Sequence, residues 1–487
     1  MRSGRDYLES IADARTVIVD GERVERVAQH PAFAGVAASV ARLYDEAHDR
    51  ANGMVATFGN GTVGNAAFLI PRSREDLARR REAIARWARL SHGFLGRSPD
   101  HVASFFAGFA SAPGVFDRKH SFGENVRRWY ERIVEEDLYA AYVIIPPQVD
   151  RSTTAQGWDE QFLQVGIAKE RDDGVVLRGS QMLGTGAAVA NVLFVSCIKP
   201  LAPGDEPYAI SVVVPLSTPG LRVYCRRPYA LGIPSAFDYP LSARFDEPDA
   251  LVVFDDVFVP FENAFVLGDV EGVRSQFFDT PAHVLGNSQA QIRFAEKLKF
   301  IVGIARRIAA VNGIDRLPPV QGVLGELAAL AAVVEGMVVA AEASAEANEN
   351  GVFCPNPRFV YGAMGLQAEI YPRVLGLLRD LAGGGVLQLP SSARQLLREP
   401  DASDFERYVR SPGVSSVERV KLFKLAWDVI GSEFAGRHQQ YEMFYAGAPF
   451  VVKGYAYRNY GYEEPLALVS DFLASYGLDE EGLGASR

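Results

Sequence analysis

The stretch VGIAKERDDGVVL, residues 165–177, marks the point at which the character of this sequence changes. Two short runs rich in β-branched residues flank an Asp-Gly step, and this pattern predicts a β-hairpin. Proline and glycine separate further β-branched runs at 192–195, 208–214, 221–224 and 251–254. The region from about 141 to 270 is therefore predicted to form a β domain of the barrel or sandwich type.

Helical patterns lie on both sides of this β region. Before it, apolar residues recur at helical spacing in 33–48 and again in 74–90. After it, long amphipathic or apolar stretches predict an antiparallel bundle, with helices at about 287–311, 317–348, 358–382 and 415–435. The expected fold is α+β and consists of an N-terminal helical domain (1–140), a middle β domain (141–270), a C-terminal four-helix bundle (271–450) and a tail (451–487).

The composition limits the functions that the chain can have. It has 487 residues, of which 48% are hydrophobic, and its formal net charge is −10. An acidic balance argues against nucleic-acid binding, which needs a basic surface. Cys197, Cys225 and Cys354 lie far apart without a CxxC pair, so neither a disulfide framework nor a cysteine-based metal centre is expected. No clustered His and carboxylate spacing predicts another metal site.

Neither a targeting segment nor a membrane span is predicted. The N-terminus lacks an apolar core of signal-peptide length. The longest apolar stretch, 323–341, is interrupted by Glu326 and Glu335 and is predicted to be a buried helix of the bundle. We therefore expect a cytoplasmic protein that has no membrane partner.

A glycine motif and a helix start are the first candidates for function. Residues 59–64, GNGTVG, match GxGxxG but lack a long buried strand before them and a helix after them, which favours a surface hairpin over a dinucleotide site. In 96–101, GRSPDH, Ser98 is predicted to be the N-cap of a helix, with Arg97 outside its positive end and His101 in its first turn. This pattern favours an anion and a neutral His that can act as a base. A surface helix with solvated charges is the alternative.

Two loops are candidates for ligand contacts. One follows Pro146-Pro147 and consists of Gln148, Val149, Asp150 and Arg151. Its Arg and Gln side chains could bind a phosphate or the polar edge of a flavin, and a salt bridge within the loop is the alternative. In Gly184-Thr185-Gly186, small residues allow a planar ligand to approach the backbone, but a simple tight turn explains the pattern equally well.

Several longer motifs, taken in order, resemble the two-component aromatic monooxygenases that use reduced FAD. That family is typified by the large component of 4-hydroxyphenylacetate 3-monooxygenase and by the chlorophenol monooxygenases. The motifs cover nearly the whole chain: GRDYLES (4–10), HPAF (30–33), LGRSPD (95–100), 242–263, 389–394 and WDVIGSEFAGRH (427–438). The resemblance implies the acyl-CoA dehydrogenase-like fold, in which the flavin lies between a β-barrel domain and a helical bundle.

The resemblance also implies roles for the catalytic residues. The family holds its phenol with the Arg of a Gly-Arg-x-Pro-Asp motif, which is Arg97 here. The phenylacetate hydroxylases have a Tyr four residues later and a His before the proline-containing loop. The matching residues here are His101 and Tyr142, so the two residue types are exchanged. Arg97 is expected to stabilise a phenolate, His101 to act as a base or proton shuttle, and Tyr142 to orient the substrate; a different substrate is the alternative. Gln289 aligns where the chlorophenol branch has a substrate-side His.

For the flavin, the resemblance implies contacts from both the β domain and the bundle. Both branches of the family carry an Asn shortly after a Gly-Arg pair, and here Met443 and Phe444 occupy that stretch. One hydrogen bond to the flavin is therefore expected to be missing. The expected contacts are Gln148, Val149, Asp150, Arg151, Thr185, Arg437, Phe444, Tyr445 and Gly447.

The activity that the resemblance implies is hydroxylation of a phenol, or of another electron-rich aromatic ring, ortho to its hydroxyl. A separate NAD(P)H-flavin reductase would supply FADH2, which reacts with O2 to give a C4a-hydroperoxide that transfers oxygen to the ring. A homotetramer or homodimer is expected. The alternatives are an acyl-CoA dehydrogenase-like oxidase or dehydrogenase with bound FAD, and a non-catalytic relative. A related dehydratase needs iron–sulfur cysteines near Arg97, and the sequence has none there.

Overall fold

The computed structural model describes residues 1–59, 61–150 and 152–476. Its N-terminal part is mainly helical. The helices of this part are α1 (Gly4–Ser10), α2 (Ala34–His48), α3 (Arg74–Leu90), α4 (Pro99–Ser111) and α5 (Gly123–Glu135). Its short strands are β1 (Val17–Val19), β2 (Glu22–Val24), β3 (Val55–Thr57) and β4 (Val63–Asn65). Strands β3 and β4 pair antiparallel, which confirms the hairpin expected around the GxGxxG pattern.

Two β-sheets form the middle part. One has the strand order β2-β1-β10-β11-β7-β6 and the other β12-β9-β8-β5. Strands β6 and β7 pair with Arg171 opposite Gly174, which confirms the predicted Asp-Gly hairpin. Strand β1 joins the larger sheet because it pairs in parallel with β10. The elements here are β5 (Ala140–Val143), β6 (Gly166–Arg171), β7 (Gly174–Gln181), β8 (Val192–Val195), β9 (Ile210–Pro215), β10 (Leu221–Cys225), α6 (Ser242–Phe245), β11 (Ala250–Pro260) and β12 (Ala264–Leu267).

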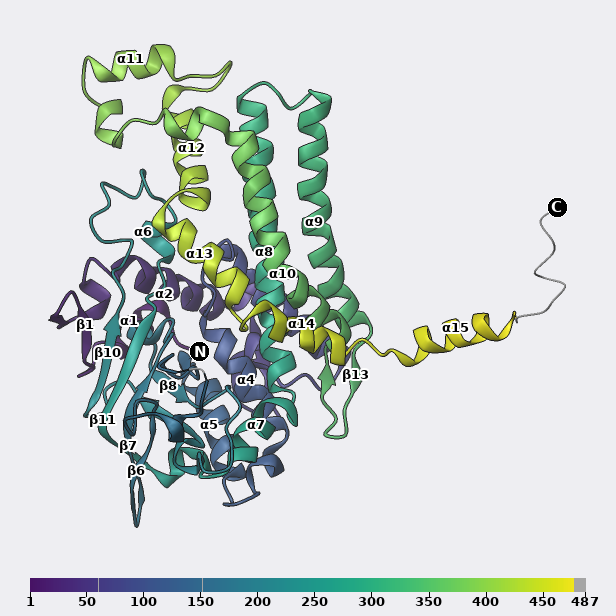
Figure 1. Cartoon of the computed structure of the whole chain (residues 1–487). Coiled ribbons are helices and arrows are strands. Elements are labelled where there is room, and N and C mark those ends of the chain that lie inside the picture. Colours follow the sequence, from purple (N-terminus) through teal and green to yellow (C-terminus); the bar gives the residue numbers. More distant parts are fainter. Residues whose placement is uncertain (60, 151, 477–487) are drawn as a thin grey trace.

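The C-terminal part consists mainly of helices. They are α7 (Val270–Phe278), α8 (Ala282–Val311), α9 (Pro318–Ala343), α10 (Pro357–Ala382), α11 (Asp401–Tyr408), α12 (Ser416–Ile430), α13 (Glu433–Phe444), α14 (Pro449–Arg458) and α15 (Glu463–Ala474), with the short strands β13 (Glu346–Ala347) and β14 (Phe353–Cys354). The longest of these helices, α8, α9 and α10, rise above the sheets in Figure 1. The single helix predicted at 415–435 is wrong. Gly431 ends α12, and the Ser432 side chain caps α13 by accepting a hydrogen bond from the Ala435 N–H.

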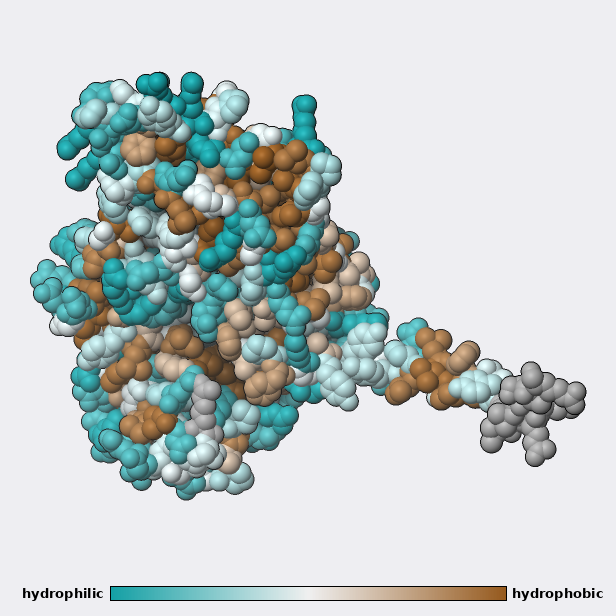
Figure 2. Space-filling view, turned by 45° about the horizontal axis from the view of Figure 1, so that its top comes forward, coloured by the Kyte–Doolittle hydropathy of each residue, from teal (hydrophilic) through white to brown (hydrophobic). Residues whose placement is uncertain are grey.

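The expectation that the apolar helix at 323–341 is buried in the bundle is wrong. Helix α9 belongs to the bundle, but most of its surface is exposed. Its buried residues are Leu327, Val334 and Ala341. By length and composition α9 could span a membrane, and only 11% of its apolar window is buried. Among the described residues, no element packs on the side of α9 that faces away from the bundle, so the apolar residues on that outer side are exposed to solvent. Figure 2 shows apolar surface in this upper right region of the molecule.

Helices α4 and α8 pack closely against each other, and the candidate site lies at the N-terminal end of α4. Helix α4 lies between the smaller sheet and α8, and Phe106 packs edge-on against Phe194 of β8 with ring centroids 5.6 Å apart. Glycines permit the approach of α8. A Cβ atom at Gly108 would lie 2.2 Å from the Ala282 backbone nitrogen, and one at Gly286 would lie 2.2 Å from the Phe105 ring.

Replacing Gly108 with Ala is expected to lower the free energy of unfolding by about 1–3 kcal/mol, because the added methyl group meets α8 backbone that cannot move aside. Urea denaturation measures this loss. The matched control is Gly303→Ala, since Gly303 is also inside a helix but a methyl group added there would have no neighbour within 4 Å. That control is expected to stabilise the protein by about 0.5–1 kcal/mol. Equal effects of both substitutions would contradict this account.

Candidate active site

The backbone of Arg97 is fixed by groups from the middle part of the chain. The Glu247 carboxylate accepts hydrogen bonds from the backbone N–H groups of Gly96 (2.9 Å) and Arg97 (2.7 Å). The Tyr139 hydroxyl donates to the Arg97 carbonyl oxygen at 2.6 Å. Since Arg97 lies just before α4, these contacts hold the N-terminal end of that helix against the β region. Ser98 is its N-cap and Pro99 its first residue, as predicted.

The Arg97 guanidinium is held by neutral groups. Its Nη2 donates to the Tyr445 carbonyl oxygen at 2.9 Å, and its Nη1 lies 2.7 Å from Nε2 of His101. Its Cζ lies over three aromatic rings, at 4.9 Å from the centroid of Tyr142, 5.3 Å from that of Tyr441 and 5.6 Å from that of Tyr445. Cation–π contacts of this kind are worth about 0.5–2 kcal/mol each. They hold the charge in place without neutralising it.

Arg97 is buried, with only 7% of its surface exposed, yet no carboxylate among the described residues pairs with its guanidinium. Other cations of this region differ in this respect. Arg437 pairs with Asp249 and Glu247, and Arg226 pairs with Asp246 and Asp249. A buried charge without a partner is costly, so the site favours an anionic ligand oxygen beside Arg97.

His101 is a buried neutral imidazole. Burial, and then the charge of Arg97, hold the pKa of His101 well below its usual value. Its Nδ1 lies 2.9 Å from Oε1 of Gln289 on α8. The alternative of a surface helix with solvated charges is wrong, because almost every residue of α4 is buried. A neutral imidazole in a dry site has the protonation state that a general base requires.

The structure brings Tyr142 of β5 to the same site, although it is 41 positions from His101 in the sequence. The two rings meet edge to face with centroids 5.4 Å apart. Burial raises the pKa of Tyr142, while the Arg97 charge opposes the rise, so the phenol is protonated at neutral pH. Its hydroxyl makes no hydrogen bond to another described residue, and it is therefore free to donate to a ligand.

The residues expected to bind flavin fall into two groups. Tyr445 contacts Arg97 directly, and Arg437 pairs with Glu247, which holds the Arg97 backbone. Thr185 joins Arg437 through Asp249, because Thr185 Oγ1 donates to Asp249 Oδ1 at 2.7 Å and Arg437 donates to the same carboxylate. Phe444 and Gly447 flank Tyr445 and are exposed. Gln148, Val149 and Asp150 are exposed on their loop, and Arg151 lies outside the described residues. Flavin contact by all of these residues stays a prediction.

The chemistry of this surface fits a flavin ring, which is planar and has an apolar edge. In the segments that carry the expected flavin contacts, three large apolar side chains are exposed: Val149 at 49%, Leu183 at 53% and Phe444 at 44%. Leu183 has a φ of +58°, an unfavourable conformation for a branched side chain. Leu183 directly precedes the Gly184–Gly186 turn, where a Cβ at Gly186 would lie 2.5 Å from the Tyr139 hydroxyl. A planar ligand against this turn would cover the exposed Leu183 side chain close to the Arg97 backbone, since a Cβ at Gly186 would lie 3.9 Å from the Arg97 carbonyl oxygen.

Sequence reasoning missed several residues of this site. Glu247 and Tyr441 touch Arg97 from distant parts of the chain, and neither belongs to a pattern with a chemical meaning of its own. Behind them, Glu442 is buried and paired with Arg293 and Lys297. Burial alone would raise the pKa of Glu442, but the two cations lower it to about 2. The residues before Glu442 in α13 are Gln439, Gln440 and Tyr441, so no sequence pattern marks it as a buried acid.

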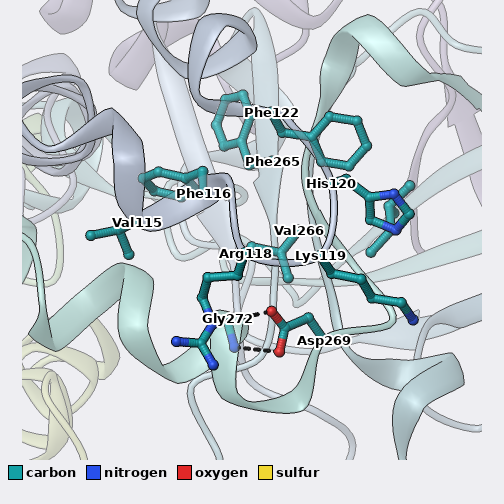
Figure 3. A pocket seen from close by; sticks show the side chains of 11 residues that line it. Val115, Phe116, Arg118, Lys119, His120, Phe122, Phe265, Val266, Asp269 and Gly272 are labelled. Atoms are coloured by element: carbon teal, nitrogen blue, oxygen red, sulfur yellow. Dashed lines mark hydrogen bonds and ion pairs between the residues drawn. The ribbon is translucent and has the colours of Figure 1, made fainter.

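A separate small hollow lies beyond the other end of α4, between the segment 115–122 and the start of α7, and its lining is drawn in Figure 3. Phe116, Phe122 and Phe265 form its apolar wall, and Asp269 there accepts hydrogen bonds from Arg118 and the Gly272 N–H. The hollow measures about 10 Å³ and has room for one water molecule. It cannot hold an aromatic ring, so the candidate site remains the cluster around Arg97.

Comparison with known proteins adds a family to this geometry. Residues 3–266 match the family model described as 4-hydroxyphenylacetate 3-hydroxylase N terminal, and residues 273–474 match the corresponding C-terminal model. The chain is 35% identical to the 4-hydroxyphenylacetate 3-monooxygenase oxygenase component of Pseudomonas aeruginosa, over 94% of this chain and 88% of that protein. It is 37% identical, over 91% and 85%, to a Streptomyces globisporus monooxygenase whose named substrate is a chloro-hydroxyphenyl propanoyl group on a peptidyl-carrier protein.

Solved structures agree with this similarity. The oxygenase component of 4-hydroxyphenylacetate 3-monooxygenase, complexed with FAD and 4-hydroxyphenylacetate, superimposes with a TM-score of 0.92 at 32% identity, covering 98% of this chain and 99% of the other. An archaeal 4-hydroxybutyryl-CoA dehydratase superimposes with a TM-score of 0.88 at 20% identity, covering 98% of this chain and 96% of the other. The second similarity concerns the fold alone.

Proposed function

Because the chain belongs to the 4-hydroxyphenylacetate 3-hydroxylase family, and is therefore a flavin-dependent aromatic monooxygenase that uses FAD and O2, we propose that Arg97 holds the phenolic oxygen of its substrate. The observation that carries this assignment is the buried guanidinium without a carboxylate partner. A phenolate oxygen beside Nη1 would supply the missing negative charge. It would also make the ring electron-rich, which attack by an electrophilic oxygen requires.

We propose that His101 takes the phenol proton. Its Nε2 is hydrogen-bonded to Nη1 of Arg97 at 2.7 Å, so a phenol oxygen that displaces this contact would accept from Arg97 and donate to His101. Tyr142 then orients the ring through its free hydroxyl. When bound, reduced FAD supplies the electrons that activate O2; one oxygen atom enters the ring and the other leaves as water. The aromatic walls of the site keep bulk water away from this chemistry.

The substrate that this geometry favours is a phenol with an open ortho position. The named substrates of relatives include 4-hydroxyphenylacetate, 4-nitrophenol and the carrier-bound chloro-hydroxyphenyl group, and each contains a phenol. Since relatives are named as oxygenase components, we propose a separate NAD(P)H-flavin reductase as the supplier of FADH2. The dehydrogenase alternative is disfavoured, because it does not explain the family to which the chain belongs.

We further propose that the protein is a cytoplasmic homo-oligomer, a tetramer or a dimer, in which a second copy covers α9 and α15. Helix α15 extends away from the body in Figure 1, and it has no buried residue. One of its faces is apolar and exposed, with Leu466 at 62%, Val469 at 55% and Phe472 at 68%. Helix α15, which we call the arm, and the outer side of α9 are both apolar and uncovered in one copy. The arm of one copy would therefore pack on α9 of another.

Replacing Arg97 with Ala is expected to lower hydroxylation of a phenol by about 10²–10³-fold, the usual cost of removing one donor to a developing oxyanion. Oxidation of reduced FAD by O2 should continue and release hydrogen peroxide. Mass spectrometry of the product and a peroxide assay measure the two outcomes separately. Arg118→Ala is the matched control, since Arg118 is exposed and pairs with Asp269. A near-normal product yield from the Arg97 variant would show that Arg97 does not hold the phenolic oxygen.

Replacing His101 with Phe is expected to change the pH dependence of kcat/KM. In the wild type the base form is present above the lowered pKa of His101, so kcat/KM should be flat through neutral pH and fall only in acid. The variant can use only phenolate formed in solution. For a phenol with a pKa of about 10, its kcat/KM should therefore rise by about tenfold per pH unit from pH 6 to 9.

A nitrophenol provides the control for His101→Phe, because the nitro group lowers the phenol pKa and the substrate arrives already ionised. The variant should hydroxylate it with nearly wild-type efficiency at neutral pH. If the pH profile with an ordinary phenol were the same in both proteins, His101 would not be the base.

Ending the chain after Gly461, which removes α15, is expected to lower the assembled mass measured by analytical ultracentrifugation. The double substitution Val469→Ser and Phe472→Ser should act in the same direction, because it removes the apolar face alone. Asp471→Ser, on the polar side of the same helix, is the control and should leave the mass unchanged. An unchanged mass in the shortened chain would exclude the arm from the interface.

A further inference from the structure

One chain of polar contacts joins α4 to α8 behind the candidate site. Nε2 of Gln289 lies 3.2 Å from Oδ1 of Asp100 and 3.4 Å from Oγ of Ser98. Oε1 of Gln289 lies 2.9 Å from Nδ1 of His101, and Nε2 of His101 lies 2.7 Å from Nη1 of Arg97. Gln289 is 1% exposed and Asp100 is 1% exposed, so bulk water does not compete for these contacts.

The donors and acceptors along this chain are determined from its Arg97 end. A guanidinium has N–H donors and no acceptor, so Nε2 of His101 must accept from Arg97. The proton of the neutral imidazole is then on Nδ1, which must donate to an oxygen. Gln289 presents its Oε1 to that position. The amide NH2 group consequently faces the other way.

The Asp100 end leads to the same assignment independently. Burial raises the pKa of Asp100 to about 6, which leaves it mostly ionised at pH 7 and able only to accept. The Ser98 hydroxyl already donates to the same carboxylate, so its oxygen is open to a donor. An amide NH2 group satisfies both oxygens. The orientation of Gln289 is therefore fixed at both ends, and rotating its amide by 180° would break both contacts.

We propose that Gln289 is a positioning residue that holds His101 in the tautomer with its proton on Nδ1 when a substrate oxygen displaces the contact between Arg97 and His101, so that the Nε2 lone pair is then open to the substrate proton. This inference rests on the proposed role of His101 as the base. It deepens that role, because a neutral His has two tautomers and only this one presents a lone pair to the phenol.

An amide at this position also keeps the base weak. After Nε2 takes the phenol proton, the imidazolium would still donate from Nδ1 to Gln289, but a neutral oxygen gives it little electrostatic stabilisation. Of the charged or titratable groups that face His101, Arg97 and Arg293 are cations, Tyr142 is neutral, and Asp100 is separated from the ring by Gln289 itself. The substrate oxygen is therefore stabilised by Arg97 rather than by a permanent ion pair with His101, and the proton can leave again.

Two variants of Gln289 separate this role from a merely structural one. Gln289→Met has a similar size but has no amide, so it should allow both tautomers once a bound phenol has taken the Arg97 N–H, and it should lower kcat/KM for an ordinary phenol by about 10–100-fold. A nitrophenol that enters as phenolate should be much less affected. Gln289→Glu keeps an acceptor toward Nδ1 and adds charge; it should raise the pKa of His101 and move the acid limb of the pH profile to higher pH.

The tautomer is measured directly on the whole protein by ¹⁵N NMR of labelled histidine. The chain has seven His residues, and the difference from His101→Phe assigns the signal. With a phenol bound and no reduced FAD present, we expect Nδ1–H in the wild type and a mixture in Gln289→Met. Gln276→Met is the matched control, because Gln276 is also buried and hydrogen-bonded but lies away from His101. It should leave the His101 signal and the pH profile unchanged.

The possible outcomes distinguish this inference from the proposed function. An Nε2–H signal in the wild type, or an unchanged tautomer in both Gln289 variants, would overturn the positioning role even if His101 is the base. An Nδ1–H signal that Gln289→Met converts to a mixture supports the positioning role. If His101→Phe then left the pH profile unchanged, the proposed base would be wrong while the tautomer assignment stood.

Discussion

A desolvated positive charge that is not neutralised is the constraint around which this site is built. Arg97 is buried, yet its guanidinium is held by a carbonyl oxygen, an imidazole and three aromatic rings. Removing a charge from water costs several kcal/mol, and a paired carboxylate would offset that cost but would also remove the attraction for a ligand anion. The surrounding groups lower the cost only in part. The remainder of the charge is available to an aromatic oxygen anion.

The acidic groups nearby are placed so that they do not remove this charge. Glu247 accepts from the backbone N–H groups of Gly96 and Arg97 rather than from the guanidinium, and it also pairs with Arg437. Asp249 is shared by Arg437 and Arg226, and Glu442 is occupied by Arg293 and Lys297. These pairs connect the β region to α13 and α13 to α8. The ion pairs therefore hold together the parts of the chain that surround Arg97 and leave its charge unpaired.

The sequence predicted the parts of the fold that have a local cause. Helical periodicity located α8 and α10 to within a few residues, and the Asp-Gly step located the β6–β7 hairpin. Burial of α9 could not be predicted, because an apolar helix has the same pattern whether its own chain or another surface covers it. In the site, Arg97 and His101 share a motif, but Glu247, Tyr441 and Gln289 approach them only in the folded chain. The φ of Leu183 has no signal in the sequence at all.

The exchange of Tyr and His that the resemblance to the phenylacetate hydroxylases implies is consistent with this geometry. His101 on α4 and Tyr142 on β5 touch edge to face, and both contact the same guanidinium. An imidazole and a phenol can therefore trade places while both remain beside the Arg97 guanidinium. What the exchange alters is the environment of the imidazole, because a His on the first turn of α4 can be reached by a side chain of α8. In our proposal an amide there sets which nitrogen carries the proton, and the packing of α4 against α8 would then contribute to the acid–base chemistry of the site.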